Sequence, residues 1–214
     1  MELFRPYAEA GREIVCFSIS AGMSTSGNVM RLAAEELGAS DRIKVIDSAN
    51  LSTGIGLLVI EAAIMAKNNR TASQIVSEIE KLKPNVRASF VVDTLTYLYR
   101  GGRCNAVAAM AGGVLKLHPR IVVEDGAMNA SKKYRGKIAS VVMNYVKDME
   151  KDLKKARPER VFITHSGCEQ ETVAKVRAYL KELDIFDEIL ETRAGGVVSS
   201  HCGPGTLGVL YIAK

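Results

Sequence analysis

The stretch that decides the fold is Glu13-Ile-Val-Cys-Phe-Ser-Ile-Ser-Ala-Gly-Met-Ser-Thr-Ser-Gly-Asn28. Its first seven residues are mostly apolar and partly β-branched, which is typical of a buried strand. A loop of small hydroxyl residues and glycine follows, and apolar residues then recur with helical spacing, at Val29, Leu32, Ala33 and Leu37. A strand, a loop and a helix in this order form half of a βαβ unit, so the stretch predicts an α/β domain with a parallel sheet.

The pattern continues up to residue 84. Residues 42–46 resemble a second strand, which ends at Asp47-Ser48. A helix is expected next, with one apolar side made by Ile55, Leu58, Val59, Ala62 and Ala66, and a further helix over about residues 71–82. We therefore expect residues 1–84 to form an N-terminal α/β domain.

After Lys83-Pro84-Asn85 the pattern changes. Strands are expected at 89–92, 121–123, 160–164 and 188–192, and helices at 106–115, 138–153 and 169–183. The dipeptide Asp125-Gly126 is a strong hairpin signal. We expect residues 85–214 to form a C-terminal α+β domain with helices on a mostly antiparallel sheet. Because ligands prefer clefts between domains, we also expect a ligand cleft between the two domains.

Composition narrows the class of protein. The chain has 214 residues, of which 47% are hydrophobic, so it can form a packed core and is neither disordered nor collagen-like. Lys and Arg number 29 against 24 Asp and Glu, a net charge of +5. These basic residues form no run of five or six, so we expect no nucleic-acid partner, and the charge argues only for an anionic ligand or partner.

Cysteine, histidine and hydropathy patterns bear on location and metal binding. The four cysteines, Cys16, Cys104, Cys168 and Cys202, show no CxxC spacing, so we expect free thiols in a reducing compartment. The longest apolar stretch, Ile55 to Ala66, is too short to cross a bilayer, and the N-terminus does not resemble a signal peptide. A cytoplasmic protein without a transmembrane segment is expected. The three histidines lie in no cluster with ligand spacing, so no metal site is expected.

The serine loop between the first strand and helix is one candidate site. It lies where backbone N–H groups and the positive end of a helix favour negative charge. Ser20, Ser24, Thr25 and Ser26 add hydroxyl donors suited to a carboxylate or phosphate. The alternative is purely structural, because an N-cap would explain Ser26 or Asn28.

A second candidate site is Ser199-Ser-His-Cys-Gly-Pro-Gly-Thr206 near the C-terminus. His201 can donate from one ring nitrogen while the other orients the ring. On an extended segment, neighbouring residues point to opposite faces, so His201 and Cys202 are not expected to form a base–nucleophile pair. Arg103 follows Gly101-Gly102, which suggests a guanidinium fixed against carboxylates or carbonyls. Both His201 and Arg103 also have a purely structural interpretation.

Together these segments resemble the DegV family, bacterial fatty-acid-binding proteins that work with a separate fatty acid kinase. The matching segments occur in family order across nearly the whole chain. They are Ile19-Ser-Ala-Gly-Met-Ser24, Val45-Ile-Asp-Ser48, Asp93-Thr-Leu-Thr-Tyr-Leu98 with Gly101-Gly-Arg103, His118-Pro119 with Asp125-Gly126, Lys133 to Arg135, and His201-Cys-Gly-Pro-Gly-Thr-Leu-Gly208.

The resemblance implies a carrier without catalytic residues, cofactor or metal. Family members hold a long-chain fatty acid in an apolar tunnel between an α/β and an α+β domain, and hydroxyl groups and a histidine bind its carboxylate. Ser20, Ser24 and His201 match those positions, and we add Ser26 and Arg103 as predicted ligand-binding residues. The partner, a fatty acid kinase, would phosphorylate the presented carboxylate to an acyl phosphate for phospholipid synthesis.

The sequence departs from the family pattern in two ways. The usual N-terminal stretch, with one strand and one threonine that binds the carboxylate, has no counterpart, so an incomplete first domain is expected. The family's Leu-Ser-Gly-Thr is Met23-Ser-Thr-Ser26 here.

Two alternatives remain open from the sequence. One is an enzyme that acts on a phosphorylated or carboxylated small molecule, with His201 as acid–base. The other is a scaffold or dimerisation fragment that binds no lipid.

Overall fold

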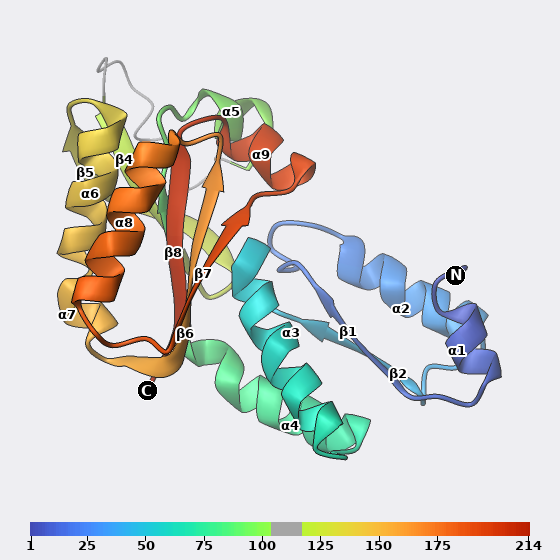
Figure 1. The fold of residues 1–214 in the computed structure, drawn as a ribbon. Helices are drawn as coiled ribbons and strands as arrows, with labels where there is room; N and C mark the ends of the chain where they lie inside the picture. The colour runs from blue at the N-terminus through green and yellow to red at the C-terminus, as the bar shows by residue number, and fades with distance from the viewer. Residues whose placement is uncertain (104–116) are drawn as a thin grey trace. The chain divides into compact units, whose positions relative to one another are not determined.

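The computed structural model describes residues 1–103 and 117–214 (Figure 1). The chain divides into two compact units, each with its own sheet. The first unit is Met1–Pro84 together with Asp125–Ala127, and the second is Asn85–Glu124 together with Met128–Lys214. The short segment Asp125–Ala127 in the first unit is an addition to the predicted division. The helix expected at 106–115 and Cys104 lie outside the described residues.

The first unit contains a two-stranded parallel sheet in which Ile14 pairs with Ile43 and Ser18 with Asp47. This confirms the predicted α/β arrangement with a parallel sheet. Its elements in chain order are α1 (Arg5–Glu9), β1 (Ile14–Ser18), α2 (Ser26–Glu36), β2 (Ile43–Asp47), α3 (Ser52–Lys67) and α4 (Ala72–Leu82). A capping box between Thr71 and Gln74 fixes the start of α4, and a short 3₁₀ turn, η1 (Lys83–Asn85), follows its end.

The helix predicted after the serine loop is confirmed as α2, but its large apolar residues are not the ones that it buries. Val29 and Leu32 are 61% and 57% exposed, and the buried residues of this helix are Gly27 and Ala34. A Cβ atom on Gly27 would lie only 2.8 Å from Ser18 Oγ. The helix therefore packs against the sheet through its smallest residues, which a search for large apolar residues does not detect. In α3 the prediction holds for Leu58 and Ala62, whereas Ile55 is half-buried and Val59 and Ala66 are exposed.

The second unit contains a six-stranded sheet in the order β5-β4-β3-β8-β6-β7. β3 pairs antiparallel with β4 and β8, β6 pairs antiparallel with β8, and β6 pairs parallel with β7. This confirms the expected α+β class with a mostly antiparallel sheet. The elements are β3 (Val86–Val91), α5 (Thr96–Arg100), β4 (Leu117–Glu124), β5 (Ala127–Arg135), α6 (Ile138–Asp148), α7 (Glu150–Leu153), β6 (Ala156–Ser166), α8 (Gln170–Glu182), β7 (Glu188–Arg193), α9 (Gly196–Cys202) and β8 (Thr206–Ala213).

The turn between β4 and β5 follows the sequence signal. Asp125 and Gly126 have φ angles of 50° and 75°, the left-handed conformations that a tight hairpin turn requires. The two strands that flank the turn are neighbours in the sheet. The hairpin prediction is therefore confirmed.

One face of the large sheet packs against α6 and α8. α6 contacts β3 and β4, and α8 contacts β6 and β7 (Figure 1). The helix predicted at 138–153 buries Val141, Val142, Tyr145, Met149 and Leu153 here, although it is divided at Met149 into α6 and α7. This core contains Val91, Val141, Val142, Tyr145, Ile163, Val173, Val176, Leu180, Leu207 and Val209.

The opposite face of the large sheet is also apolar. Strand side chains alternate between faces, so the neighbours of the core residues in β3, β6 and β8 point away from α6 and α8. Phe90 lies opposite Ile121 on β4 and Gly208 on β8, and Leu210 lies opposite Ala88 and Phe162. The sheet therefore has a second apolar side, whose residues Phe90, Ile121 and Leu210 are themselves buried.

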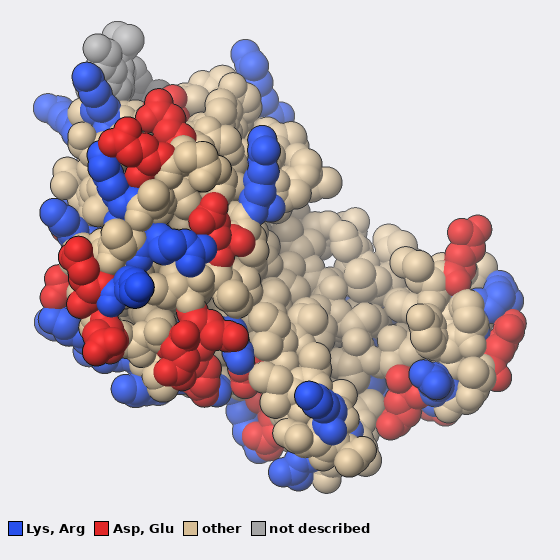
Figure 2. All heavy atoms as spheres, in the orientation of Figure 1, with Lys and Arg blue, Asp and Glu red and all other residues tan. Residues whose placement is uncertain are grey.

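Charge is divided unequally between the units. By sequence the second unit has 20 Lys and Arg against 13 Asp and Glu, and the first has 9 against 11. On the face drawn in Figure 2, basic and acidic side chains of the second unit are interspersed. The dispersed charge predicted from the sequence is thus also seen on this surface.

Of the four cysteines, the described Cys16, Cys168 and Cys202 are free thiols. Burial raises the pKa of Cys202 to about 11, and burial with the neighbouring Glu169 raises the pKa of Cys168 to about 11. A rise of two pKa units lowers the thiolate fraction near neutral pH about 100-fold.

We therefore expect iodoacetamide at pH 8 to alkylate Cys168 and Cys202 far more slowly in the native protein than in urea. Peptide mapping by mass spectrometry measures this, and rapid native labelling of either residue would contradict it.

Candidate functional site

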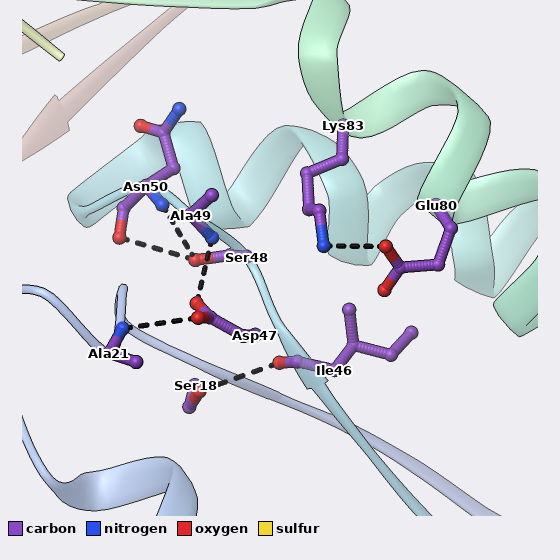
Figure 3. Close-up of polar contacts among 9 residues, drawn as sticks. All are labelled: Ser18, Ala21, Ile46, Asp47, Ser48, Ala49, Asn50, Glu80 and Lys83. Carbon is purple, nitrogen blue, oxygen red and sulfur yellow. Dashed lines mark hydrogen bonds and ion pairs between the residues drawn. The ribbon is translucent and has the colours of Figure 1, made fainter. Parts of the chain in front are cut away.

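The serine loop lies at the carboxyl ends of β1 and β2, the edge of a parallel sheet where ligands collect. Asp47, the last residue of β2, ties this loop to the turn that follows β2 (Figure 3). Its Oδ2 accepts a hydrogen bond from the Ala21 amide at 3.2 Å, and its Oδ1 accepts one from the Ala49 amide at 2.9 Å. Asp47 thus stabilises its turn and also fixes the start of the serine loop.

The turn after β2 is held by its own side chains. Ala49 and Ser52 have φ angles of 49° and 50°, so the chain reverses sharply. Ser48 Oγ donates to the Asn50 carbonyl and accepts from the Asn50 amide (Figure 3). The same carbonyl of Asn50 accepts from the Ser20 amide at 2.9 Å. The turn and the serine loop therefore form one hydrogen-bonded structure.

Ser20 ties the loop to the β4–β5 turn. Its hydroxyl is buried, donates to the Gly126 carbonyl at 2.6 Å and accepts from the Gly22 amide at 3.2 Å. A serine hydroxyl has one proton, and here Gly126 accepts it. In this arrangement Ser20 shapes the loop and has no second proton for a ligand.

Ser24 and Ser26 lie together at the start of α2. Their hydroxyl oxygens are 2.7 Å apart, and Ser24 Oγ also accepts from the Ser26 amide at 3.2 Å. Both residues are half-buried. The N-cap residue is Thr25, whose side chain makes no capping hydrogen bond, so capping does not explain Ser26. A pair of hydroxyls shares one proton internally and retains a second, which can donate to an anion.

His201 lies in the last turn of α9, so the prediction of an extended segment is wrong. The small residues around it form a short helix that ends at Gly203, whose φ is 77°. The imidazole ring of His201 packs on Gly101, where a Cβ atom would lie 1.9 Å from Nδ1. Nδ1 is buried without a hydrogen-bond partner among the described residues. Nε2 is therefore the ring nitrogen through which His201 can bind a ligand.

Arg103 is bound to the same glycine. Its Nη1 donates to the Gly101 carbonyl at 2.8 Å. This contact matches the structural interpretation of Arg103, a guanidinium held against a carbonyl. The structure thus brings Arg103 and His201 together at Gly101 in the second unit, and Ser20, Ser24 and Ser26 belong to the first unit. Sequence reasoning missed Gly101 and Asn50 as organising residues, although the Gly101-Gly102 pair before an arginine was a signal for the former.

Residues 1–103 and 117–214 contain no group of three or more His, Cys, Asp or Glu side chains that could hold a metal ion. No helix in the same ranges is long and apolar enough to span a membrane.

The chain is similar in sequence to proteins of a known family. A model of the family described as "Uncharacterised protein, DegV family" matches residues 1–214. A DegV domain-containing protein of Deinococcus radiodurans is 32% identical over 212 residues, which are 97% of this chain and 74% of that protein.

Solved structures with the same fold are described as fatty-acid-binding proteins. The structure of fatty acid binding by a DegV family protein from Thermus thermophilus superposes with a TM-score of 0.89 at 26% identity, covering 100% of this chain and 75% of that one. A stearic-acid-binding protein from Eubacterium ventriosum superposes with a TM-score of 0.82 at 27% identity, covering 100% of this chain and 74% of that one.

Proposed function

This chain belongs to the DegV family, and on that premise we propose that it binds a long-chain fatty acid whose carboxylate is held by Ser24, Ser26 and His201. The observation that carries the proposal is the pairing of Ser24 and Ser26 at the start of α2, with one hydroxyl proton left to donate. His201 supports it, since only its Nε2 is left to bind a ligand. Relatives of the same fold that bind fatty acids, one of them stearic acid, support the choice of ligand.

The energetics suit this ligand. A palmitate-length chain buried at about 0.8 kcal/mol per CH₂ gains roughly 10 kcal/mol before the costs of binding are subtracted. The second apolar face of the large sheet, with the buried side chains Phe90, Ile121 and Leu210, has the apolar chemistry that an acyl chain requires. The carboxylate loses its water, so hydroxyl and imidazole donors must replace those hydrogen bonds. Within this proposal Ser20 and Arg103 shape the site through Gly126 and Gly101.

The direct test is the lipid content of the purified protein. We expect native mass spectrometry and lipid extraction to reveal a co-purified long-chain fatty acid, and a delipidated sample to bind oleate with one-to-one stoichiometry. A protein that carries no lipid and binds neither oleate nor stearate would overturn the proposal.

Removal of the carboxylate ligands should weaken binding without unfolding the protein. We expect Ser24→Ala and His201→Ala each to raise the Kd for oleate about 10- to 100-fold, because a hydrogen bond to a charged group contributes about 1.5–3 kcal/mol. Ser131→Ala on the exposed part of β5 is the matched control and should leave the Kd unchanged. Fluorescence displacement titrations with a labelled fatty acid measure all three. Equal Kd values for all variants would remove Ser24 and His201 from the site.

We further propose that the protein is a cytoplasmic carrier that presents the carboxylate to a fatty acid kinase. The kinase would then form the acyl phosphate, and this protein would not catalyse the reaction. Reconstitution with a kinase from the same organism should give acyl phosphate only when both proteins are present. Turnover of a phosphorylated or carboxylated small molecule by this protein alone, abolished in His201→Ala, would instead support an enzyme with His201 as acid–base.

A further inference from the structure

We propose that Tyr97 is a positioning residue, which fixes the ring of His201 through a reciprocal contact between α5 and the turn after α9. This inference rests on the proposed function, because it concerns how His201 is held for a ligand. The evidence is a pair of close contacts between the same two segments of the second unit, α5 with Gly101 and α9 with Gly203. In each contact an aromatic ring lies directly on a glycine of the other segment.

The first contact places the Tyr97 ring on Gly203. A Cβ atom on Gly203 would lie 2.2 Å from Tyr97 Cδ2 and 2.5 Å from Cε2, so no side chain fits there. Gly203 has a φ of 77°, which also favours glycine. Two residues earlier, the His201 ring lies on Gly101 in the second contact, with a would-be Cβ 1.9 Å from Nδ1. Each segment thus supplies one ring and one glycine.

Backbone hydrogen bonds set the spacing within each segment. The Gly101 amide donates to the Tyr97 carbonyl at 2.9 Å, which holds the ring of α5 and its glycine one helical turn apart. The Gly203 amide donates to the Ser199 carbonyl at 2.8 Å, closing the end of α9. Because each segment is internally fixed, seating Tyr97 on Gly203 also determines where His201 meets Gly101.

The reciprocal contact has a chemical consequence for His201. Its Nδ1 lies sealed against Gly101 with no hydrogen-bond acceptor among the described residues. A proton on Nδ1 would be unpaired there, so the proton belongs on Nε2, where it can donate to a carboxylate. Removing the Tyr97 ring would release the turn that contains Gly203 and Gly205, both with φ of 77°, and with it the ring of His201.

The experiment uses ring-retaining and ring-removing variants of the full chain. We expect Tyr97→Phe to bind oleate like the wild type, and Tyr97→Ala and Gly101→Ala to bind at least tenfold more weakly. Gly195→Ala is the matched control for the added methyl group, because its φ is −64° and no atom lies within 4 Å of the new Cβ. Thermal unfolding of each variant reports whether a loss of binding reflects unfolding, and Tyr97→Leu replaces Tyr97→Ala if the latter does not fold.

The deciding measurement is ¹⁵N NMR of the His201 ring, which distinguishes the two tautomers and does not depend on lipid. We expect the Nε2–H tautomer in the wild type, Tyr97→Phe and Gly195→Ala, and a shift toward tautomer exchange in Tyr97→Ala and Gly101→Ala. An unchanged His201 spectrum in folded Tyr97→Ala or Tyr97→Leu would overturn the positioning role. If the wild type binds no fatty acid but the spectra change as expected, the proposed function fails and the positioning role stands.

Discussion

Two glycines of α3 should respond to the same substitution with opposite signs. Gly54→Ala is expected to lower the free energy of unfolding by about 1–3 kcal/mol, the usual cost of forcing extra volume into a packed site. A Cβ atom on Gly54 would lie 2.0 Å from Asn50 Oδ1 and 2.6 Å from its Cγ. Gly56→Ala is expected to raise the free energy of unfolding by about 0.5–1 kcal/mol, because alanine is the better helix former. The atom nearest to the new Cβ, Thr53 Cβ, is 3.8 Å away.

Urea denaturation of the two variants and the wild type provides the measurement. Both variants replace a glycine of the same helix with alanine. A difference in the sign of their effects on the free energy of unfolding can therefore be assigned to the contact with Asn50. Equal effects of both substitutions would show that the Asn50 side chain moves aside without cost.

Gly54→Ala should also affect the candidate site, because Asn50 contacts the serine loop. Asn50 Oδ1 accepts from the Leu51 amide at 3.0 Å, and the carbonyl of Asn50 holds the Ser20 amide. A displaced Asn50 therefore loosens the serine loop as well as α3. We infer that the packing of one glycine in α3 and the geometry of the serine loop are coupled through this turn.

Much of the fold could be predicted from local patterns. The apolar, partly β-branched residues of the first strand and the Asp125-Gly126 turn identified elements that the structure contains, because these signals act over a few residues. The large apolar residues of α6 also identified its buried side correctly. In each case the local preference and the tertiary structure favour the same conformation.

The errors have a common physical origin. The buried side of α2 is made by Gly27 and Ala34, whose contribution is close approach rather than apolar area. The segment of His201 was expected to be extended, whereas it is the end of a short helix. Hydrophobic periodicity does not detect an element that packs through glycine, so the partners of these glycines emerge only from the structure.

The same holds for the site residues: local patterns located them, but their tertiary partners could not be predicted. The serine loop was located by its place after a strand, but the sequence contains no sign that the Ser20 proton is accepted by the distant Gly126 carbonyl. Likewise Arg103 was singled out by the two glycines before it, and its partner proves to be one of them, Gly101. Long-range hydrogen bonds decide which hydroxyls and cations remain available, and no local pattern records them.

Tyr145→Phe should have the largest effect on the second unit. The Tyr145 hydroxyl is fully buried, donates to the Ser89 carbonyl at 2.8 Å and accepts from the Val209 amide at 3.0 Å. Removing it takes one hydrogen bond from each of these backbone groups and a third from Ser89 Oγ, 2.9 Å away, inside the core, so we expect a loss of about 2–4 kcal/mol in the free energy of unfolding. Tyr179→Phe is the control, because that hydroxyl donates to the partly exposed Glu150 and its loss should cost less than about 1 kcal/mol.

The pH dependence of this difference provides a second, independent check. Burial raises the pKa of Tyr145 above its usual value of 10.0, so the folded state retains the neutral phenol after the unfolded chain has begun to ionise. The stabilisation is complete below pH 10 and is lost as the pH rises above it, at up to about 1.4 kcal/mol per pH unit for one group. Since Tyr145→Phe lacks this group, its deficit relative to the wild type should shrink between pH 10 and 11. Urea denaturation at each pH measures the deficit. A constant deficit over this interval would mean that the Tyr145 hydroxyl ionises as readily in the folded protein as in the unfolded chain, and a growing one that it ionises more readily; either would contradict a raised pKa.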